Sequence, residues 1–151
     1  MVTIRKARRD DLSAIVAMLA DDALGLAREV LSDPVDRRYV AAFEAIEADD
    51  NQLLAVAVSP EGQVLGCLQI SFIPGLSRLG LWRGQIESVR VAADARGRGI
   101  GRQMLAWAID TCRARGCKLV QLTSDKRRDD AIRFYRSLGF EPTHEGFKLS
   151  L

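Results

Sequence analysis

The chain has 151 residues, of which 48% are hydrophobic and 28% are charged, and its formal net charge is +2. Because a domain usually has about 100–200 residues, we expect one domain over residues 1–151. The composition excludes a disordered, collagen-like or low-complexity protein. No apolar run approaches the ~18 residues of a membrane span, and the segment after Met1 is too polar for a signal peptide. We therefore expect a cytoplasmic protein.

The two halves of the chain differ in charge. Residues 1–75 carry 7 Lys and Arg against 12 Asp and Glu, a net charge of −5, whereas residues 76–151 carry 15 against 8, a net charge of +7. A basic half attracts anions, and Arg96, Arg98 and Arg102 lie around a glycine cluster, which favours a phosphate site. Few aromatic residues lie among the basic ones to stack on bases, so no nucleic-acid partner is expected.

The three cysteines, Cys67, Cys112 and Cys117, form no C-x-x-C pair, and His144 is the single histidine. This pattern favours neither a disulfide framework nor a zinc site, and no metal is expected. We expect buried thiols in a reduced protein.

The first half of the chain predicts two helices and three strands. Alternation over residues 2–7 indicates a strand, and apolar residues at helical spacing then predict a helix after Asp10 and Asp11: Leu12, Ile15, Val16 and Leu19. A second helix is expected over residues 35–48. Residues 53–58 and 64–73 flank a turn and predict a β-hairpin.

The second half predicts a strand, a helix and a parallel strand in succession. A strand over residues 85–92 leads through a glycine-rich turn into a helix that Gly116 ends, and residues 119–123 follow as a short buried strand. A last helix is expected between Asp129 and Gly139. Residues 140–151 are expected to form a final pair of strands.

The glycine-rich turn is the most informative segment. Gly97, Gly99 and Gly101 allow the backbone to pass close to a ligand, and the first N–H groups of the next helix lack intrahelical partners. The turn therefore predicts a phosphate site, although tight packing of a helix on a strand also uses glycine. The Walker loop needs Gly-Lys-Ser/Thr, which is absent, and the spacing of the dinucleotide fingerprint is not met.

Two motifs resemble those of the GNAT family of N-acetyltransferases. Residues 96–101 (RGRGIG), after the strand of residues 86–91, resemble the acetyl-CoA signature R/Q-x-x-G-x-G/A, and residues 133–140 (RFYRSLGF) resemble x-F-Y-x-x-x-G-F. The order of elements is similar along the whole chain. The resemblance implies an α/β fold with a mixed, mostly antiparallel central sheet of six or seven strands and helices on both faces.

The resemblance also implies that acetyl-CoA is the cosubstrate. The pyrophosphate would lie against the turn, at Arg96, Gly97, Arg98, Gly99, Ile100 and Gly101. Backbone groups at Val89 and Val91 would pair with the pantetheine arm like an added strand, where the fourth and fifth strands separate. Many family members have Asn where this chain has Arg128, which we expect to reach a phosphate instead.

Transfer of an acetyl group to an amine needs a base for the amine and an acid for the leaving thiolate. The resemblance assigns the acid to Tyr135. Glu87 is expected to face the pocket and to accept a proton from the amine, directly or through a water. Its alternative role is to bind a cationic substrate.

Three stretches, residues 82–86, 105–108 and 126–135, resemble the aminoalkylphosphonate N-acetyltransferases of this family. The acceptor implied is a small primary amine that carries an anion, and Arg78, Arg83 or Arg90 could bind that anion. A protein lysine or N-terminus is the alternative acceptor. A non-catalytic acyl-CoA sensor, which would not need Tyr135 and Glu87, and a nucleic-acid binder are alternative functions. The family also implies a homodimer, for which the apolar segment of residues 76–82 could form the interface.

Overall fold

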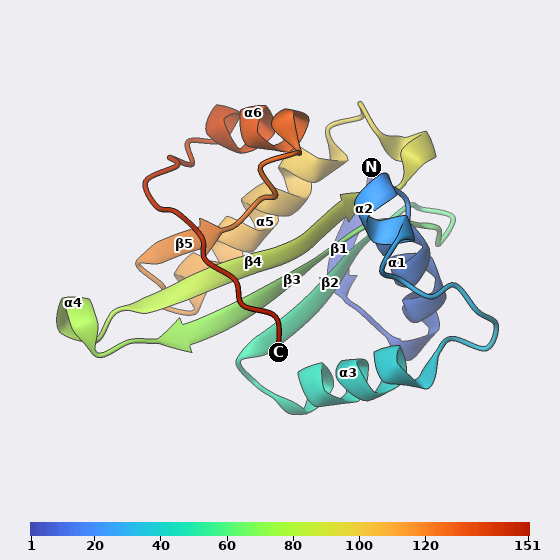
Figure 1. Cartoon of the computed structure of the whole chain (residues 1–151), viewed down its shortest axis with the longest axis horizontal. Coiled ribbons are helices and arrows are strands. Elements are labelled where there is room, and N and C mark those ends of the chain that lie inside the picture. Colours follow the sequence, from blue (N-terminus) through green and yellow to red (C-terminus); the bar gives the residue numbers. More distant parts are fainter.

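The computed structural model describes residues 1–151 and contains one sheet of five strands in the order β1-β2-β3-β4-β5 (Figure 1). The strands are β1 (Thr3–Lys6), β2 (Gln52–Val58), β3 (Val64–Pro74), β4 (Trp82–Val91) and β5 (Leu119–Leu122). The first four pair in antiparallel fashion, and β5 lies parallel to β4. The mixed, mostly antiparallel sheet predicted from the sequence is confirmed, with five strands in place of six or seven.

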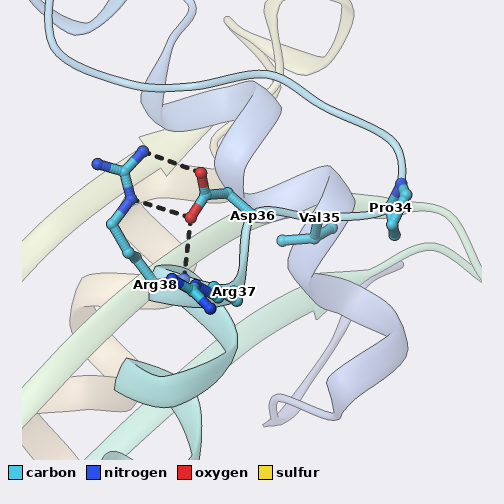
Figure 2. A pocket seen from close by; sticks show the side chains of 5 residues that line it. All are labelled: Pro34, Val35, Asp36, Arg37 and Arg38. Carbon is cyan, nitrogen blue, oxygen red and sulfur yellow. Dashed lines mark hydrogen bonds and ion pairs between the residues drawn. The ribbon is translucent and has the colours of Figure 1, made fainter.

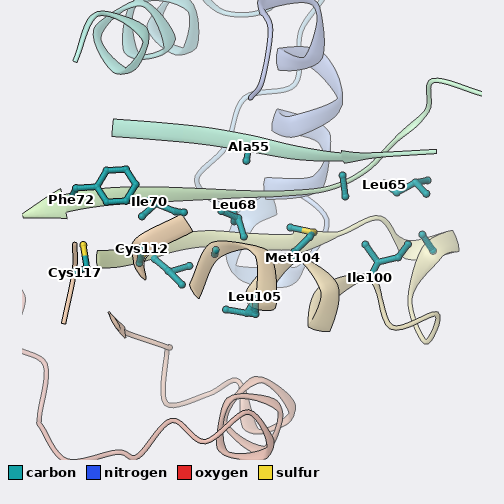
Figure 3. Packing of buried hydrophobic residues seen from close by; sticks show 14 residues of the cluster. Ala55, Leu65, Leu68, Ile70, Phe72, Ile100, Met104, Leu105, Cys112 and Cys117 are labelled. Carbon is teal, nitrogen blue, oxygen red and sulfur yellow. The ribbon is translucent and has the colours of Figure 1, made fainter. Parts of the chain in front are cut away.

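Helices cover both faces of this sheet, as predicted. The helical segments are η1 (Arg9–Asp11), α1 (Leu12–Leu19), α2 (Ala23–Leu26), α3 (Arg37–Ala48), α4 (Ser77–Gly80), η2 (Ala93–Ala95), α5 (Ile100–Ala114) and α6 (Asp129–Ser137). α1 and α3 lie on one face, and α5 lies on the other (Figures 1 and 3). The crossover from β4 through α5 to β5 makes the parallel pair. None of the helices has the length and apolarity to cross a membrane.

The core under α5 combines the two periodicities of strand and helix. Leu68, Ile70 and Phe72 alternate along β3, while Met104 and Leu105 lie on the inward face of α5, and all five are almost completely buried (Figure 3). A Cβ atom at Gly84 would collide with the Cys112 side chain. Glycine at this position therefore lets α5 lie directly on β4.

The opposite face has a second core, in which β2 supplies Val56 and the helices α1 and α3 supply Ile15 and Phe43. Cys67 of β3 is completely buried there, and burial raises the pKa of its thiol to about 12. Cys112 and Cys117 are also buried, and all three cysteines are free. The predicted burial of the thiols is confirmed.

Asp11 connects β1 to the start of α1. The Arg5 guanidinium donates to both of its carboxylate oxygens, at 2.8 and 3.1 Å, and the backbone N–H of Arg8 donates to Oδ2 at 2.7 Å. Burial acts to raise the pKa of Asp11, but these hydrogen bonds outweigh it and hold the pKa below its ordinary value. The carboxylate is therefore ionised and fully paired.

The predicted strands within residues 140–151 are wrong. The segment has no regular structure, and every residue from 141 to 151 is exposed. Phe147, Leu149 and Leu151 do alternate as in a strand, but a strand also needs a neighbouring edge with which to form hydrogen bonds. The sequence predictions also missed α2, because four residues are too few to show helical periodicity.

Candidate active site

A β-bulge interrupts β4 near its carboxyl end. Gln69 of β3 faces Glu87, and Cys67 faces Arg90, so Ser88 and Val89 together stand opposite Leu68. Ser88 has a φ of 55°, and its carbonyl oxygen accepts a hydrogen bond from Cys67 Sγ at 3.6 Å. A bulge bends its strand and re-aims the side chains that follow it.

The strands β4 and β5 separate directly before this bulge. Their pairing begins at Arg83 and Leu119 and ends at Ile86 and Leu122. From Glu87 onward, the backbone of β4 has no strand partner on this side. The carbonyl oxygens of Val89 and Val91 accept hydrogen bonds from arginine side chains instead, at 2.9 and 3.3 Å. The separation predicted at Val89 and Val91 is therefore present in the fold.

The glycine turn lies at the end of β4 and begins α5. Gly97 and Gly99 have φ values of 78° and 77°, in the left-handed region that favours glycine. A Cβ atom at either residue would meet no atom within 4 Å, so these glycines serve the backbone conformation rather than tight packing. Gly99 is the N-cap of α5 and no side chain caps this end. The first N–H groups of the helix therefore face open space.

The other residues of the turn divide into side chains at the surface and side chains in the core. Arg96 and Arg98 are exposed: Arg96 Nη2 lies 3.0 Å from Asp21 Oδ2, and Arg98 Nη2 donates to the carbonyl oxygen of Asp94 at 2.8 Å. Ile100, the first residue of α5, has a buried side chain, so it can offer only its backbone N–H to a ligand. Such a turn can hold an anion with backbone donors and two cationic side chains.

Tyr135 is a half-buried residue of α6. Its ring packs against Phe134 and Phe140, with centroid separations of 5.3 and 6.0 Å, and its hydroxyl has no hydrogen-bond partner within the protein. Burial raises its pKa, and the positive charges of Arg90 and Arg128 act in the opposite direction. The phenol is therefore protonated at neutral pH and free to donate a proton to a ligand.

Arg128 lies directly before α6. Its Nη1 is 2.6 Å from Oδ2 of Asp22, which lies between α1 and α2. The side chain thus contacts Asp22, and the structure shows no contact between it and the glycine turn.

Glu87 is exposed, and a row of polar side chains adjoins it on the same face of the sheet. Gln52 Oε1 accepts from Gln69 Nε2 at 3.1 Å and from Ser71 Oγ at 2.8 Å, and Gln121 Nε2 donates to Gln85 Oε1 at 2.7 Å. We call these five residues the polar row. The sequence analysis missed it, although Gln69 and Ser71 alternate with the buried residues of β3, which was the available signal.

One surface hollow lies elsewhere, at the start of α3. It measures about 650 Å³ and is lined by Pro34, Val35, Asp36, Arg37 and Arg38 (Figure 2). A side-chain hydrogen bond from Arg38 lowers the pKa of Asp36 to about 2, and the same carboxylate accepts from the Arg38 backbone N–H at 2.9 Å. The hollow is therefore the surface of a helix cap, and it contains none of the residues described above. No group of three His, Cys, Asp or Glu side chains is placed to hold a metal ion.

Known proteins are similar to this chain in both fold and sequence. A family model described as the acetyltransferase (GNAT) family matches residues 14–140. The chain is 29% identical to an aminoalkylphosphonate N-acetyltransferase of Salmonella typhimurium, over 98% of this chain and 90% of that one. It is 31% identical to an L-methionine sulfoximine/L-methionine sulfone acetyltransferase of Pseudomonas aeruginosa, over 92% and 80%. A crystal structure of a transcriptional regulator from Bacillus halodurans superposes with a TM-score of 0.96, at 49% identity and with complete coverage of both chains.

The chain therefore belongs to the acetyltransferase (GNAT) family. It is an enzyme of the N-acetyltransferase class, and the resemblance noted in its two motifs is confirmed.

Proposed function

We propose that the protein transfers the acetyl group of acetyl-CoA directly to the primary amine of a small molecule. The observation that carries the proposal is the opening between β4 and β5, which has the glycine turn at its end and a free tyrosine hydroxyl beside it. An extended ligand with a phosphate at one end and a reactive group at the other suits this arrangement.

The cofactor-binding residues in this proposal follow from the unpaired backbone. The pantetheine arm forms hydrogen bonds with the backbone at Val89 and Val91, as an added strand would, and replaces the Arg90 and Arg96 side chains that donate to these two carbonyl oxygens in its absence. The N–H groups of Gly97 to Gly101 bind the pyrophosphate, and the exposed side chains of Arg96 and Arg98 add positive charge. Arg98 donates to the carbonyl oxygen of Asp94, and Arg96 contacts Asp21 and the carbonyl oxygen of Val91, so a phosphate would replace these partners.

The chemistry proceeds by direct attack. Glu87 accepts a proton from the ammonium form of the acceptor, and the neutral nitrogen attacks the carbonyl carbon of the thioester. The tetrahedral intermediate collapses, the bond from carbon to sulfur breaks, and the departing thiolate takes the proton of the Tyr135 hydroxyl. The nitrogen, which became positively charged on attack, loses its second proton, and this proton restores the Tyr135 phenol. The proton taken by Glu87 passes to solvent. The products are the N-acetylated amine and free CoA.

The acceptor class rests on the named relatives and on the polar row. An aminoalkylphosphonate and the amino acid L-methionine sulfone are both small primary amines with an anionic group. The polar row gives the sheet face beside Glu87 neutral hydrogen-bonding groups, which suit a small polar substrate. A protein lysine or N-terminus is the alternative acceptor.

The experiment is a screen of amines with acetyl-CoA, in which the released CoA thiol is measured. The panel contains aminoalkylphosphonates, amino acids, polyamines and lysine peptides. We expect the highest kcat/KM with a small anionic amine. A clear preference for peptides or polyamines would contradict the acceptor class, and no thiol release with any amine would contradict the enzyme function.

The similar protein from Bacillus halodurans is described as a transcriptional regulator. Two other functions are therefore tested, those of an acyl-CoA sensor and of a nucleic-acid binder. Acetyl-CoA should raise the Tm because it binds the folded protein. We expect no salt-dependent binding to DNA, because few aromatic residues lie among the basic ones to stack on bases. A sensor would show the rise in Tm without turnover.

We also propose that one domain over residues 1–151 forms a homodimer. Leu76 and Leu79 are fully exposed, at 99% and 105%, and Trp82 beside them is 37% exposed. An apolar patch of this kind suits an interface. Light scattering at micromolar concentration tests this, and a monomer would contradict it.

We propose the cytoplasm as the location. The free, buried thiols support a reducing compartment. Fractionation of the source cells tests this, and recovery outside the cytoplasm would contradict it.

A further inference from the structure

Two adjacent aspartates between α1 and α2 form ion pairs with arginines from opposite sides of the opening. Asp21 Oδ2 lies 3.0 Å from Arg96 Nη2, and Asp22 Oδ2 lies 2.6 Å from Arg128 Nη1. Arg96 belongs to the glycine turn after β4, whereas Arg128 lies between β5 and α6. Consecutive Cα atoms are only about 3.8 Å apart, so one short segment connects the two sides. We call these two ion pairs the clasp.

Arg96 also connects the clasp with the unpaired edge of β4. Its Nε donates to the carbonyl oxygen of Val91 at 3.3 Å, while its Nη2 contacts Asp21. One guanidinium thus engages a backbone acceptor that an added strand would use and the segment between the two helices. A phosphate bound to this guanidinium would stand beside the Asp21 carboxylate, and the two negative charges would repel each other. Asp21 and the pyrophosphate therefore compete for Arg96.

The two halves of the clasp differ in exposure and in their other contacts. The side chains of Arg96 and Asp21 are 56% and 46% exposed. Those of Arg128 and Asp22 are only 26% and 31% exposed. Asp22 Oδ1 also accepts from the backbone N–H of Gly25 at 2.6 Å and caps α2, whereas the Asp21 carboxylate has no partner besides Arg96. Exposed ion pairs are weak, so the Asp21 half opens more easily.

We propose that the clasp is an autoinhibitory contact across the opening, and that acetyl-CoA opens its Asp21 half. In the free protein, Asp21 holds Arg96 and keeps the segment between α1 and α2 on the glycine turn. The pyrophosphate takes Arg96 and releases Asp21, while Asp22 keeps the segment attached to Arg128. The proposal rests on the proposed function and adds a control on its cofactor step.

The first test measures the Kd of acetyl-CoA for Asp21→Asn by calorimetry without an acceptor. Asparagine keeps the shape of the side chain and removes its charge, so we expect the Kd to fall about two- to fivefold, the range that exposed ion pairs reach. Asp94→Asn is the matched control, because Asp94 is an exposed acid beside the same turn that forms no ion pair. An unchanged Kd, or an equal fall in the control, would overturn the clasp.

The second test uses acetyl donors that differ in their phosphates. Acetyl-dephospho-CoA keeps the pyrophosphate, and S-acetylpantetheine lacks it. We expect Asp21→Asn to raise kcat/KM for acetyl-CoA and acetyl-dephospho-CoA equally and to leave the value for S-acetylpantetheine unchanged. An equal gain with all three donors would show that Asp21 does not compete with the pyrophosphate, and it would overturn the proposal.

The third test is a double-mutant cycle. In an Arg96→Gln background, Asp21→Asn should no longer change the Kd of acetyl-CoA. Arg98→Gln is the control background, because Arg98 contacts the carbonyl oxygen of Asp94 rather than Asp21, and there the full effect should remain. Equal effects in both backgrounds would overturn the pairing. Failure of the wild type to bind acetyl-CoA would instead overturn the proposed function.

The fourth test needs no substitution. Amide hydrogen exchange of the wild type is compared with and without acetyl-CoA, because exchange reports local opening. The Asp21 N–H, which donates to the carbonyl oxygen of Met18 at 3.3 Å, should exchange faster with the cofactor bound. The Gly25 N–H, which donates to Asp22, should exchange at the same rate. Slower exchange at Asp21, or faster exchange at both residues, would contradict an opening of the Asp21 half alone.

Discussion

Ile86 of β4 and Leu122 of β5 form the last paired position of the two parallel strands. Beyond this pair, β4 enters its bulge and continues to the glycine turn, whereas the chain after β5 turns toward α6. Beyond Ile86, this edge of β4 therefore has no strand partner. An edge of this kind is a ready site for an extended ligand.

We predict that Gly99→Glu weakens acetyl-CoA binding at least tenfold, which corresponds to about 1.4 kcal/mol. The new carboxylate would stand at the N-terminus of α5, in the space proposed for the pyrophosphate, and would repel it. Isothermal titration calorimetry measures the affinity. Unchanged affinity would remove this turn from the cofactor site.

Gly116→Glu is the matched control for Gly99→Glu. Gly116 has a φ of 83°, and a Cβ atom there also meets no atom within 4 Å, but it lies at the other end of α5. The control therefore introduces the same charge and similar backbone strain away from the turn. It should bind acetyl-CoA with the affinity of the wild type.

Asp11→Asn should lower the free energy of unfolding by about 1–3 kcal/mol at pH 7, because it removes the charge that Arg5 and Arg8 satisfy. Folding lowers the pKa of Asp11. Its contribution to the free energy of unfolding is therefore fully present above the unfolded pKa of about 3.9, and it is lost as the pH falls through the pKa of the folded protein. Urea titrations at pH 7 and pH 3 measure the difference.

The control is Asp10→Asn, because Asp10 is exposed and adjacent in sequence. It should change the free energy of unfolding by less than about 0.5 kcal/mol. A loss at Asp11→Asn that is equally large at pH 3 would show that packing, rather than charge, makes the contribution.

Much of the fold could be predicted because local patterns express it. The apolar segments that flank the turn at residues 59–62 predict a hairpin, the helical spacing from Ile100 to Cys112 predicts a buried helix face, and the structure confirms both. The prediction of strands in residues 140–151 was wrong because a strand pattern records only that apolar and polar residues alternate. It does not state that a partner strand lies beside it.

The candidate site depends on relationships that no local pattern records. The glycine turn could be located from sequence because Gly97 and Gly99 have a local conformational role. The contact of Arg128 with Asp22 joins residues far apart in the chain, and the bulge at Ser88 depends on register with β3. The polar row likewise requires four strands to be aligned.

Glu87→Gln should lower kcat/KM near neutral pH and recover activity as the pH rises, because an amine that loses its proton to solvent no longer needs the carboxylate. A pH profile of kcat/KM, recorded for wild type and variant with the same acceptor, measures this. Glu61→Gln, at an exposed acid between β2 and β3, is the control. A profile parallel to that of the wild type, with a raised KM, would instead assign Glu87 to substrate binding.

The central claim is that acetyl transfer takes place in the opening beside Tyr135. The most direct measurement is kcat for CoA release by wild type and Tyr135→Phe, together with the Kd for acetyl-CoA. We predict that kcat falls by about 10²–10⁴, the usual contribution of a general acid, while the Kd stays within about twofold. Because burial raises the pKa of Tyr135, the wild type should keep this general acid protonated to a higher pH than a solvent-exposed tyrosine would. Equal kcat values for the two proteins would contradict the claim.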